Sequence, residues 1–283
     1  MAITLIADSG STKAEWCLLD GKKKKSITTQ GISPYFLSAQ QIQAILEKEL
    51  RPKIKNPPAE IYYYGTGCSN PANVKAVKSA LQNVFGKHDG YRVKIEVDHD
   101  LMGAARALCG HEQGVACILG TGSNSCYYNG KRIVKNSPGL GFILGDEGSG
   151  AYLGRKVIQH FLYNTFEPDL MDRFNAKYNT NAVEILEAVY KGPLPNRYLA
   201  SFTGFLVENR GHFMIENIIE DSFNDFFFNH LYKYKESWTH PIHFIGSVAY
   251  GFKDVLLEMC SNYELQLGRV LKQPMDGLVK YHS

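Results

Sequence analysis

The sequence predicts an α/β protein of two lobes that share one β-β-β-α-β-α core. Its 283 residues are 44% hydrophobic and 21% charged, which is sufficient for two cores of ordinary domain size. An apolar run over residues 3–7, a polar turn, a second run over 14–19 and an Asp-Gly turn return in the same order over 115–130. This repetition predicts an N-terminal lobe over residues 1–108 and a C-terminal lobe over 109–283 with helical insertions.

Apolar spacing predicts each element of the first lobe. Short apolar runs indicate strands, and apolar positions that recur at helical spacing indicate amphipathic helices. Three prolines, Pro52, Pro57 and Pro58, end the first helix. The expected order is strands at 3–7, 14–19 and 25–29, a helix at 38–51, a strand at 61–64, a helix at 74–84, a strand at 93–97 and a helix at 104–108.

The second lobe repeats the hairpin and then becomes mainly helical. A phenylalanine-rich stripe in its longest helix indicates core packing rather than a ligand pocket. The expected elements are strands at 115–119 and 125–128, helices around 150–165, 182–191 and 212–235, a strand at 243–245 and a helix that ends near 267.

Composition and charge exclude several classes of protein. The net charge is +3, and the one basic run, Lys22–Lys25, follows Asp20-Gly21 as a solvated hairpin tip would, so no nucleic-acid partner is predicted. The chain has no signal-like start and no run of about 18 apolar residues, so no membrane partner and a cytoplasmic location are predicted. The six cysteines form no C-x-x-C pair, which favours reduced thiols over a zinc site or disulfides.

The first polar turn has the composition of a phosphate-binding loop. Asp8 lies at a strand end, and the small residues after it allow backbone N–H groups to point at an anion. Neither a P-loop nor a Rossmann fingerprint occurs in the chain. An ordinary Asp-Ser-Gly bend is the alternative if this turn is taken alone. The turn comprises Ser9, Gly10, Ser11, Thr12 and Lys13.

A second glycine-rich turn occupies the equivalent position of the repeated hairpin. It comprises Gly120, Thr121, Gly122, Ser123 and Asn124. Two amide-lined turns at corresponding positions of two lobes favour binding of one polyphosphate, and therefore of a nucleotide.

A pair of acids, Asp98 and Asp100, follows a strand, at the sheet edge where α/β proteins bind ligands. Phosphoryl transfer to an alcohol requires a carboxylate that accepts the hydroxyl proton, opposite an in-line phosphate and Mg²⁺. We predict this role for Asp100, whereas Asp98 is expected to cap the following helix and His99 to be structural.

The segment 139–150 combines glycines with two adjacent acids. This composition indicates that the backbone approaches a ligand closely. Asp146 suits a sugar hydroxyl or a Mg²⁺-bound water, and Glu147 is equally explained as the cap of a helix that begins near 150.

Together these motifs resemble the BadF/BadG/BcrA/BcrD ATPase family, and its sugar kinases in particular. The resemblance rests on Asp8–Lys13, Gly120–Asn124, Gly145–Ser149 and Phe244–Val248, and it spans nearly the whole chain. It implies the sugar kinase, Hsp70 and actin fold, with two ribonuclease-H-like lobes and a nucleotide cleft between them. It further implies ATP and Mg²⁺ as cofactors and phosphoryl transfer to a hydroxyl of an amino sugar such as N-acetylglucosamine.

The resemblance also implies roles for individual residues. Asp100 matches the catalytic base, and Asp8 matches the acid that orients hydrated Mg²⁺. The matching nucleotide-binding positions are Gly10, Ser11, Thr12, Lys13, Thr121, Gly122, Ser123, Gly246 and Ser247. The matching sugar-binding positions are Asp100, Thr121, Asn124, Gly139 and Asp146.

The sequence departs from this family at Tyr35, which stands where the sugar kinase has an asparagine that holds the sugar. The preferred sugar, the hydroxyl that is phosphorylated and a possible homodimer are therefore left open. A nucleotide-driven switch that acts on a protein partner is the alternative function. The iron-sulfur activators of the same family are disfavoured because no cysteine lies in a short turn beside the second loop.

Overall fold

The chain divides into two compact units in the computed structural model, which describes residues 2–88 and 91–283. The first unit comprises Met1–His111 and Pro274–Ser283, and the second comprises Glu112–Gln273. The sequence analysis placed the division at residue 108 and assigned the whole C-terminus to the second lobe. The segment Pro274–Ser283 differs from that expectation because it packs within the first unit.

The first unit is built on a five-stranded mixed sheet of order β3-β2-β1-β4-β7. Its first three strands are antiparallel, whereas β1, β4 and β7 run parallel. All five strands predicted from apolar spacing are confirmed. They are β1 (Thr4–Ser9), β2 (Lys13–Asp20), β3 (Lys23–Gln30), β4 (Glu60–Gly65) and β7 (Lys94–His99).

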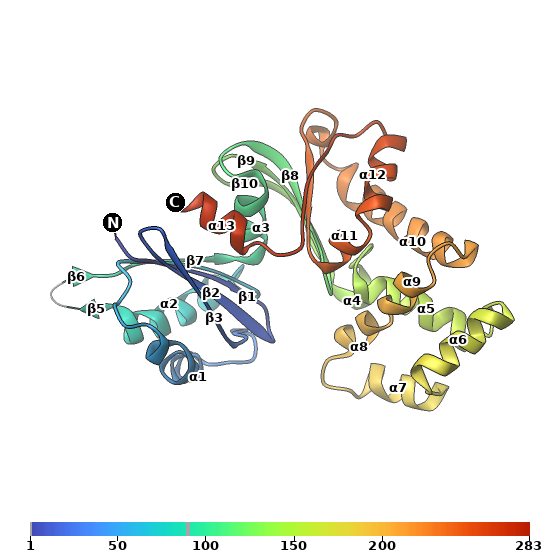
Figure 1. Ribbon diagram of the computed structural model, residues 1–283, viewed down its shortest axis with the longest axis horizontal. Helices are drawn as coiled ribbons and strands as arrows, with labels where there is room; N and C mark the ends of the chain where they lie inside the picture. The colour runs from blue at the N-terminus through green and yellow to red at the C-terminus, as the bar shows by residue number, and fades with distance from the viewer. Residues whose placement is uncertain (1, 89–90) are drawn as a thin grey trace. The chain divides into compact units, whose positions relative to one another are not determined.

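Helices cover both faces of this sheet (Figure 1). Trp16, Tyr63 and Leu81 belong to the core under α1 and α2, whereas α3 and α13 lie on the opposite face. A hairpin of β5 (Lys87–His88) and β6 (Tyr91–Arg92) precedes β7. The helices are α1 (Ala39–Ile45), which continues as a π-helical turn (Leu46–Leu50) and a 3₁₀ turn (Arg51–Lys53), α2 (Pro71–Phe85), α3 (Asp100–Cys109) and α13 (Met275–Tyr281).

The second unit repeats the same sheet, with the order β10-β9-β8-β11-β12. Again three antiparallel strands are followed by two that run parallel to the first of them. The predicted α/β fold with a duplicated core is therefore confirmed. The strands are β8 (Gln113–Leu119), β9 (Ser123–Asn129), β10 (Ile133–Ser137), β11 (Ile242–Ile245) and β12 (Leu267–Leu271).

A long helical insertion joins β10 to β11. The predicted phenylalanine stripe is confirmed as core, because Phe223, Phe226 and Phe227 are fully buried. The insertion contains α4 (Gly141–Leu144), α5 (Gly150–Leu162), α6 (Pro168–Tyr178), α7 (Ala182–Tyr190), α8 (Pro195–Ser201), α9 (Thr203–Glu208), α10 (Phe213–Phe226), a π-helical turn (Phe227–Leu231) and a 3₁₀ turn (Lys235–Trp238). Beyond β11 lie α11 (Ser247–Gly251) and α12 (Lys253–Asn262). None of the described helices has the length and apolar character needed to cross a lipid bilayer.

The C-terminal helix α13 is anchored to the first unit through His282. Its ring stacks on Tyr62 with a centroid distance of 3.8 Å, and its Nε2 lies 2.8 Å from the Tyr64 hydroxyl. The Tyr64 oxygen accepts a hydrogen bond from Arg106 at 2.6 Å, so its own proton can be donated to a neutral His282. Burial, and then the positive charge of Arg106, lower the pKa of His282 to about 4.

Mild acid is therefore expected to destabilise the first unit. The pKa of His282 in the folded protein lies below its usual 6.5. As the pH falls, the unfolded chain therefore takes up the proton first, and the stability that is present above pH 6.5 is lost toward pH 4. We expect the free energy of unfolding to fall by about 1–2 kcal/mol, because solvent screens the charge of this partly exposed ring. Urea unfolding at pH 7 and pH 5 measures this loss. His282→Gln should show a smaller pH dependence, and an equal dependence in both proteins would contradict the assignment.

Candidate active site

Two carboxylates meet at the carboxyl edge of the first sheet. The parallel register places Asp8 beside Tyr64 and Tyr64 beside Asp98, so the chain leaves these strands at one edge. Asp100 begins α3 directly after β7. The negative charges of Asp8 and Asp100 interact, and the two predicted carboxylates are therefore neighbours in space.

The environment of this pair disfavours negative charge. Burial, and then the negative charges of Asp100 and Glu15, raise the pKa of Asp8 to about 7, although the positive charge of Lys13 opposes them. Burial also raises the pKa of Asp100, although its Oδ1 accepts a hydrogen bond from the Leu101 N–H at 2.8 Å. Two neighbouring carboxylates repel each other, and a bound cation would relieve that repulsion. The pair therefore fits Mg²⁺, which proteins bind through one or two carboxylates together with substrate phosphates.

The cap of α3 differs from the expectation. Asp98 was predicted to cap this helix, but the N-cap residue is His99, whose Nδ1 accepts a hydrogen bond from the Met102 N–H at 3.3 Å. Asp98 instead accepts from the His99 N–H at 2.9 Å. The capping prediction for Asp98 was wrong by one residue, and the structural role predicted for His99 takes the form of this cap.

The turn between β1 and β2 presents unpaired N–H groups. Gly10 donates to the carbonyl of Lys13 at 3.0 Å and so closes the turn. Within the described part of the chain, the N–H groups of Ser11 and Thr12 have no acceptor, and both residues are exposed. Such a pair of exposed amides is suited to bind a phosphate oxygen.

Gly31 supports this turn, a role that the sequence analysis did not predict. The Gly31 N–H donates to the Thr12 carbonyl at 2.9 Å. A Cβ added at Gly31 would lie 2.4 Å from the Thr12 nitrogen and 2.5 Å from both the Gly10 oxygen and the Lys13 nitrogen. Because these contacts are to backbone atoms, any side chain here must displace the turn.

Gly31→Ala is expected to weaken nucleotide binding selectively. Displacing the Ser11 and Thr12 amides removes hydrogen bonds to charged oxygens, each worth about 1.5–3 kcal/mol, so we expect the Kd for ATP to rise at least about tenfold. Calorimetric titration of the variant and of the unmodified protein with ATP measures the two Kd values. Gly204→Ala is a matched control, since the nearest atom to its added Cβ is the flexible Lys177 Nζ at 3.5 Å. An unchanged Kd in the folded Gly31→Ala variant would contradict the role of the turn.

The equivalent turn of the second unit also presents free amides. Its Gly120 and Thr121 carbonyls accept hydrogen bonds from the first amides of α5, at 2.8 and 3.0 Å. Among the described residues, the N–H groups of Thr121 and Gly122 have no acceptor. The second turn therefore offers donors to an anion in the same way as the first.

Asp146 is built into the second turn. It is buried, with 8% of its surface exposed, and has a positive φ of 58°. Its Oδ1 accepts a hydrogen bond from the Ser123 N–H at 3.3 Å, and Gly122 is so close that a Cβ would lie 2.9 Å from Oδ2. Burial raises the pKa of this carboxyl, the Ser123 N–H lowers it and Glu147 raises it. A buried carboxylate beside an amide-lined turn is a strong acceptor for a ligand hydroxyl.

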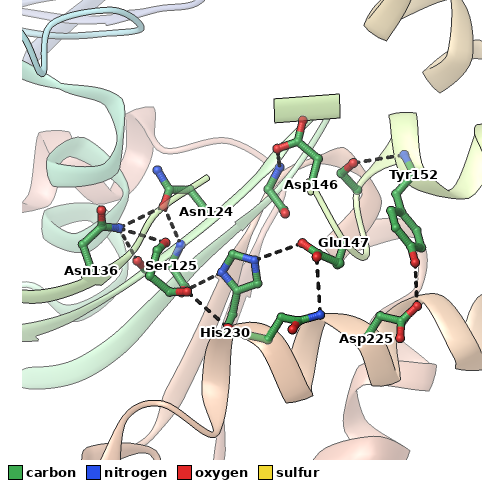
Figure 2. A network of polar contacts seen from close by, with 12 residues as sticks. Asn124, Ser125, Asn136, Asp146, Glu147, Tyr152, Asp225 and His230 are labelled. Atoms are coloured by element: carbon green, nitrogen blue, oxygen red, sulfur yellow. Dashed lines mark hydrogen bonds and ion pairs between the residues drawn. The ribbon is translucent and has the colours of Figure 1, made fainter. Parts of the chain in front are cut away.

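A buried polar network holds the strand that follows the second turn (Figure 2). Asn124 Oδ1 accepts hydrogen bonds from the Ser125 N–H and from the side-chain amide of Asn136, at 2.9 and 3.0 Å. The Ser125 hydroxyl lies 3.2 Å from His230 Nδ1, and His230 Nε2 lies 3.4 Å from Glu147. Asn124 is therefore held by the backbone of the buried Ser125 and by the exposed side chain of Asn136.

Glu147 does not cap α5, contrary to the alternative considered for it. The cap is Ser149, whose hydroxyl accepts a hydrogen bond from the Tyr152 N–H at 3.2 Å. Glu147 turns toward His230 instead, as Figure 2 shows. It also accepts a hydrogen bond from the side-chain amide of Asn229 at 3.3 Å. Gly139 packs against β9, where a Cβ would lie 2.9 Å from the Ser123 oxygen.

A cavity of about 200 Å³ adjoins the second turn. Gly246 has a φ of 126°, and a Cβ on it would lie 2.2 Å from the Leu119 oxygen, so only glycine allows β8 and β11 to end together here. Some of the residues that line the cavity come from the glycine-rich turns that the sequence predicted, namely Gly120, Thr121 and Ser247. Others come from α8 and α9, which local sequence patterns did not predict. Its lining is Gly120, Thr121, Gly150, Ala200, Thr203, Val207, Ser247, Val248, Gly251 and Phe252.

Other ligand-type residues lie elsewhere. Tyr35 is 62% exposed, and its ring contacts Gly67, where a Cβ would lie 2.9 Å from the ring. All six cysteines are buried. Within the described residues, a group of metal-ligand type that contains none of the predicted site residues is formed by the exposed Glu167 and Asp169 and the half-buried His212.

The sheet that is repeated in the two units defines an α/β protein with an actin-like fold. No protein-family model matches the sequence, and no curated protein matches it either. Among solved structures, MreB 5 of Spiroplasma citri bound to AMPPNP is similar in fold, with 10% identity, coverage of 100% of this chain and 95% of that one, and a TM-score of 0.58.

A presumed N-acetylglucosamine kinase from Porphyromonas gingivalis is much more similar. The two chains are 40% identical, the match covers 99% of this chain and 98% of the other, and the TM-score is 0.92. A presumed N-acetylglucosamine kinase from Chromobacterium violaceum shares the fold, with 16% identity, coverage of 100% and 99%, and a TM-score of 0.73. The chain belongs to the same family as the Porphyromonas gingivalis protein.

Proposed function

We propose that this protein is an ATP-dependent sugar kinase that phosphorylates a hydroxyl of an amino sugar such as N-acetylglucosamine. The observation that carries the proposal is the pairing of Asp8 with Asp100 in the unit that also presents the free amides of Ser11 and Thr12. Phosphoryl transfer to an alcohol requires a group that accepts the hydroxyl proton and groups that bind the phosphate, and a carboxylate beside such a turn provides both. Membership of the family of the Porphyromonas gingivalis protein supports the same activity.

In the proposed reaction Asp100 accepts the proton of the sugar hydroxyl. The hydroxyl oxygen forms a bond to the γ-phosphorus as the bond from that phosphorus to the β-phosphate oxygen breaks, which yields sugar phosphate and ADP. A raised pKa makes Asp100 a better proton acceptor than an exposed aspartate. Mg²⁺, when bound near Asp8, would neutralise phosphate charge.

The second unit supplies binding groups in this proposal. The free amides of Thr121 and Gly122 bind phosphate, and the cavity beside Ser247 takes the adenosine. Asn124, Gly139 and Asp146 contact the sugar, as the family resemblance implies. The hydrogen bonds that hold Asn124 and the buried Asp146 favour a ligand recognised by fixed hydrogen bonds.

Coupled release of ADP tests the function. Purified protein with ATP and Mg²⁺ is assayed with N-acetylglucosamine, N-acetylmuramic acid, N-acetylmannosamine, glucosamine and glucose. We expect turnover that depends on one N-acetyl sugar and disappears when EDTA removes Mg²⁺. ATP binding without stimulation by any sugar would overturn the kinase and favour the nucleotide-driven switch of a protein partner.

A further inference from the structure

The first unit has a concave site that is lined mainly by lysines. It is a groove of about 490 Å³ at the start of β1, the end of β2 and the start of β3, closed by the segment that follows α1. Asp20 is its one acidic residue among nine lining residues. The lining is Ile3, Leu18, Asp20, Lys23, Lys24, Lys25, Lys53, Lys55 and Asn56.

This groove is separate from the proposed catalytic edge. Ile3 lies at the amino end of β1 and Asp8 at its carboxyl end. At about 3.3 Å per residue, β1 places them roughly 17 Å apart. None of the groove residues belongs to the phosphate-binding turn, so the groove is a distinct feature of the first unit.

The fold brings the lysines together from two segments. Lys25 Nζ donates to the Lys53 carbonyl at 2.7 Å, and Lys53 Nζ donates to the Thr28 carbonyl at 3.1 Å. These hydrogen bonds fix two ammonium groups at the wall of the groove and leave each with further N–H donors. Lys23, at the start of β3, and Lys55, in the segment that follows the 3₁₀ turn, also line the groove.

The five lysines outnumber the one acid of the groove, Asp20. Over residues 2–88 and 91–283, no ion pair within 4 Å joins any of the five to an aspartate or glutamate, although other lysines, such as Lys94 and Lys135, have such partners. Clustered cations repel one another, and an anion in the groove would remove that repulsion. The sequence analysis treated Lys22–Lys25 as a solvated tip and did not foresee Lys53 and Lys55 opposite it.

We propose that this groove binds a small, multiply charged phosphate compound free in solution. Its volume is that of a small-molecule site. A nucleic acid would need a basic face extending over several phosphates, whereas this cluster ends at one groove and the pI of the chain is only about 8.4. The class of ligand is therefore a compact polyphosphate or polyphosphorylated metabolite, held by charge-assisted hydrogen bonds.

Lysine acetylation of the whole protein, read by mass spectrometry, locates the site. Sodium tripolyphosphate is the probe, and ADP is present in excess to occupy the nucleotide turns. We expect protection of Lys53 and Lys55 but not of Lys48 and Lys75, which are exposed elsewhere on the same unit. Protection confined to Lys13 would assign the phosphate to the nucleotide turn and overturn the proposal.

Affinity measurements with matched variants complete the test. Lys23→Gln with Lys55→Gln removes two charges without touching the hydrogen bonds of Lys25 and Lys53, and should raise the Kd for tripolyphosphate by about tenfold. Lys48→Gln with Lys75→Gln should change it less than about twofold. Equal losses in both double variants would show unspecific attraction, and binding to anionic lipid vesicles without binding of tripolyphosphate would show a membrane surface. Either result overturns the proposal, and neither depends on kinase activity.

Discussion

Replacing Asp100 with asparagine is expected to lower kcat for sugar phosphorylation by about 10²–10⁴-fold, the range typical for loss of a general base. Asparagine cannot take up the hydroxyl proton, but its Oδ1 can still accept the Leu101 N–H that Asp100 accepts at 2.8 Å. The start of α3 should therefore keep its geometry. Steady-state kinetics with saturating ATP and sugar measure the loss.

Asp98→Asn is the matched control for this prediction. Asp98 lies on the same strand end, and its bond from the His99 N–H at 2.9 Å survives as a bond to the amide oxygen. We expect its kcat to stay within about threefold of the unmodified protein. ATP should bind both variants with similar Kd. Full activity of a folded Asp100→Asn variant would show that the base is another group.

Local sequence patterns suffice for the two hairpins and their turns. Apolar alternation and Asx-Gly turns act within a dozen residues, so the strands of the repeat follow from short stretches of chain. The pairing of Asp8 with Asp100 was also predictable, because parallel strands in an α/β sheet bring their carboxyl ends to one edge. The closeness of these two carboxylates therefore follows from their positions at the ends of strands.

Helix caps were harder to predict. Two polar residues precede each of two helices by three residues or fewer: Asp98 and His99 precede α3, and Glu147 and Ser149 precede α5. Each can accept an N–H bond, and the choice depends on the backbone angle at which the chain leaves the strand or turn. Composition alone does not determine that angle. The structure selects His99 and Ser149, which leaves Asp98 and Glu147 for other contacts.

Contacts between segments that are distant in the sequence could not be predicted from local patterns. Gly31 meets Thr12, and Lys53 meets Lys25, only because β2 and β3 pair and the segment after α1 returns to them. Ala200, Thr203 and Val207 reach the cavity through the insertion, whose short helices carry weak periodicity. The strand β12 was missed because none of its residues is fully buried and it contains Gly268.

Asp146→Asn is expected to raise KM for the sugar by about 10–100-fold while KM for ATP changes less than about twofold. A hydrogen bond from a sugar hydroxyl to a buried carboxylate contributes about 1.5–3 kcal/mol, and a neutral amide forms a weaker one. Asparagine tolerates the positive φ of 58° at this position. Its Oδ1 can also keep the bond from the Ser123 N–H, so the second turn should stay in place.

The position of Asp146 permits a test that separates recognition from support of the fold. Asp225 is a half-buried acid of the same unit that accepts a hydrogen bond from the Tyr152 hydroxyl at 2.6 Å, and Asp225→Asn should leave KM for the sugar unchanged. Thermal unfolding of both variants checks that each is folded. If Asp146→Asn raised KM for ATP as much as KM for the sugar, the carboxylate would serve the nucleotide turn, and the sugar would have to be recognised by other groups around Asn124.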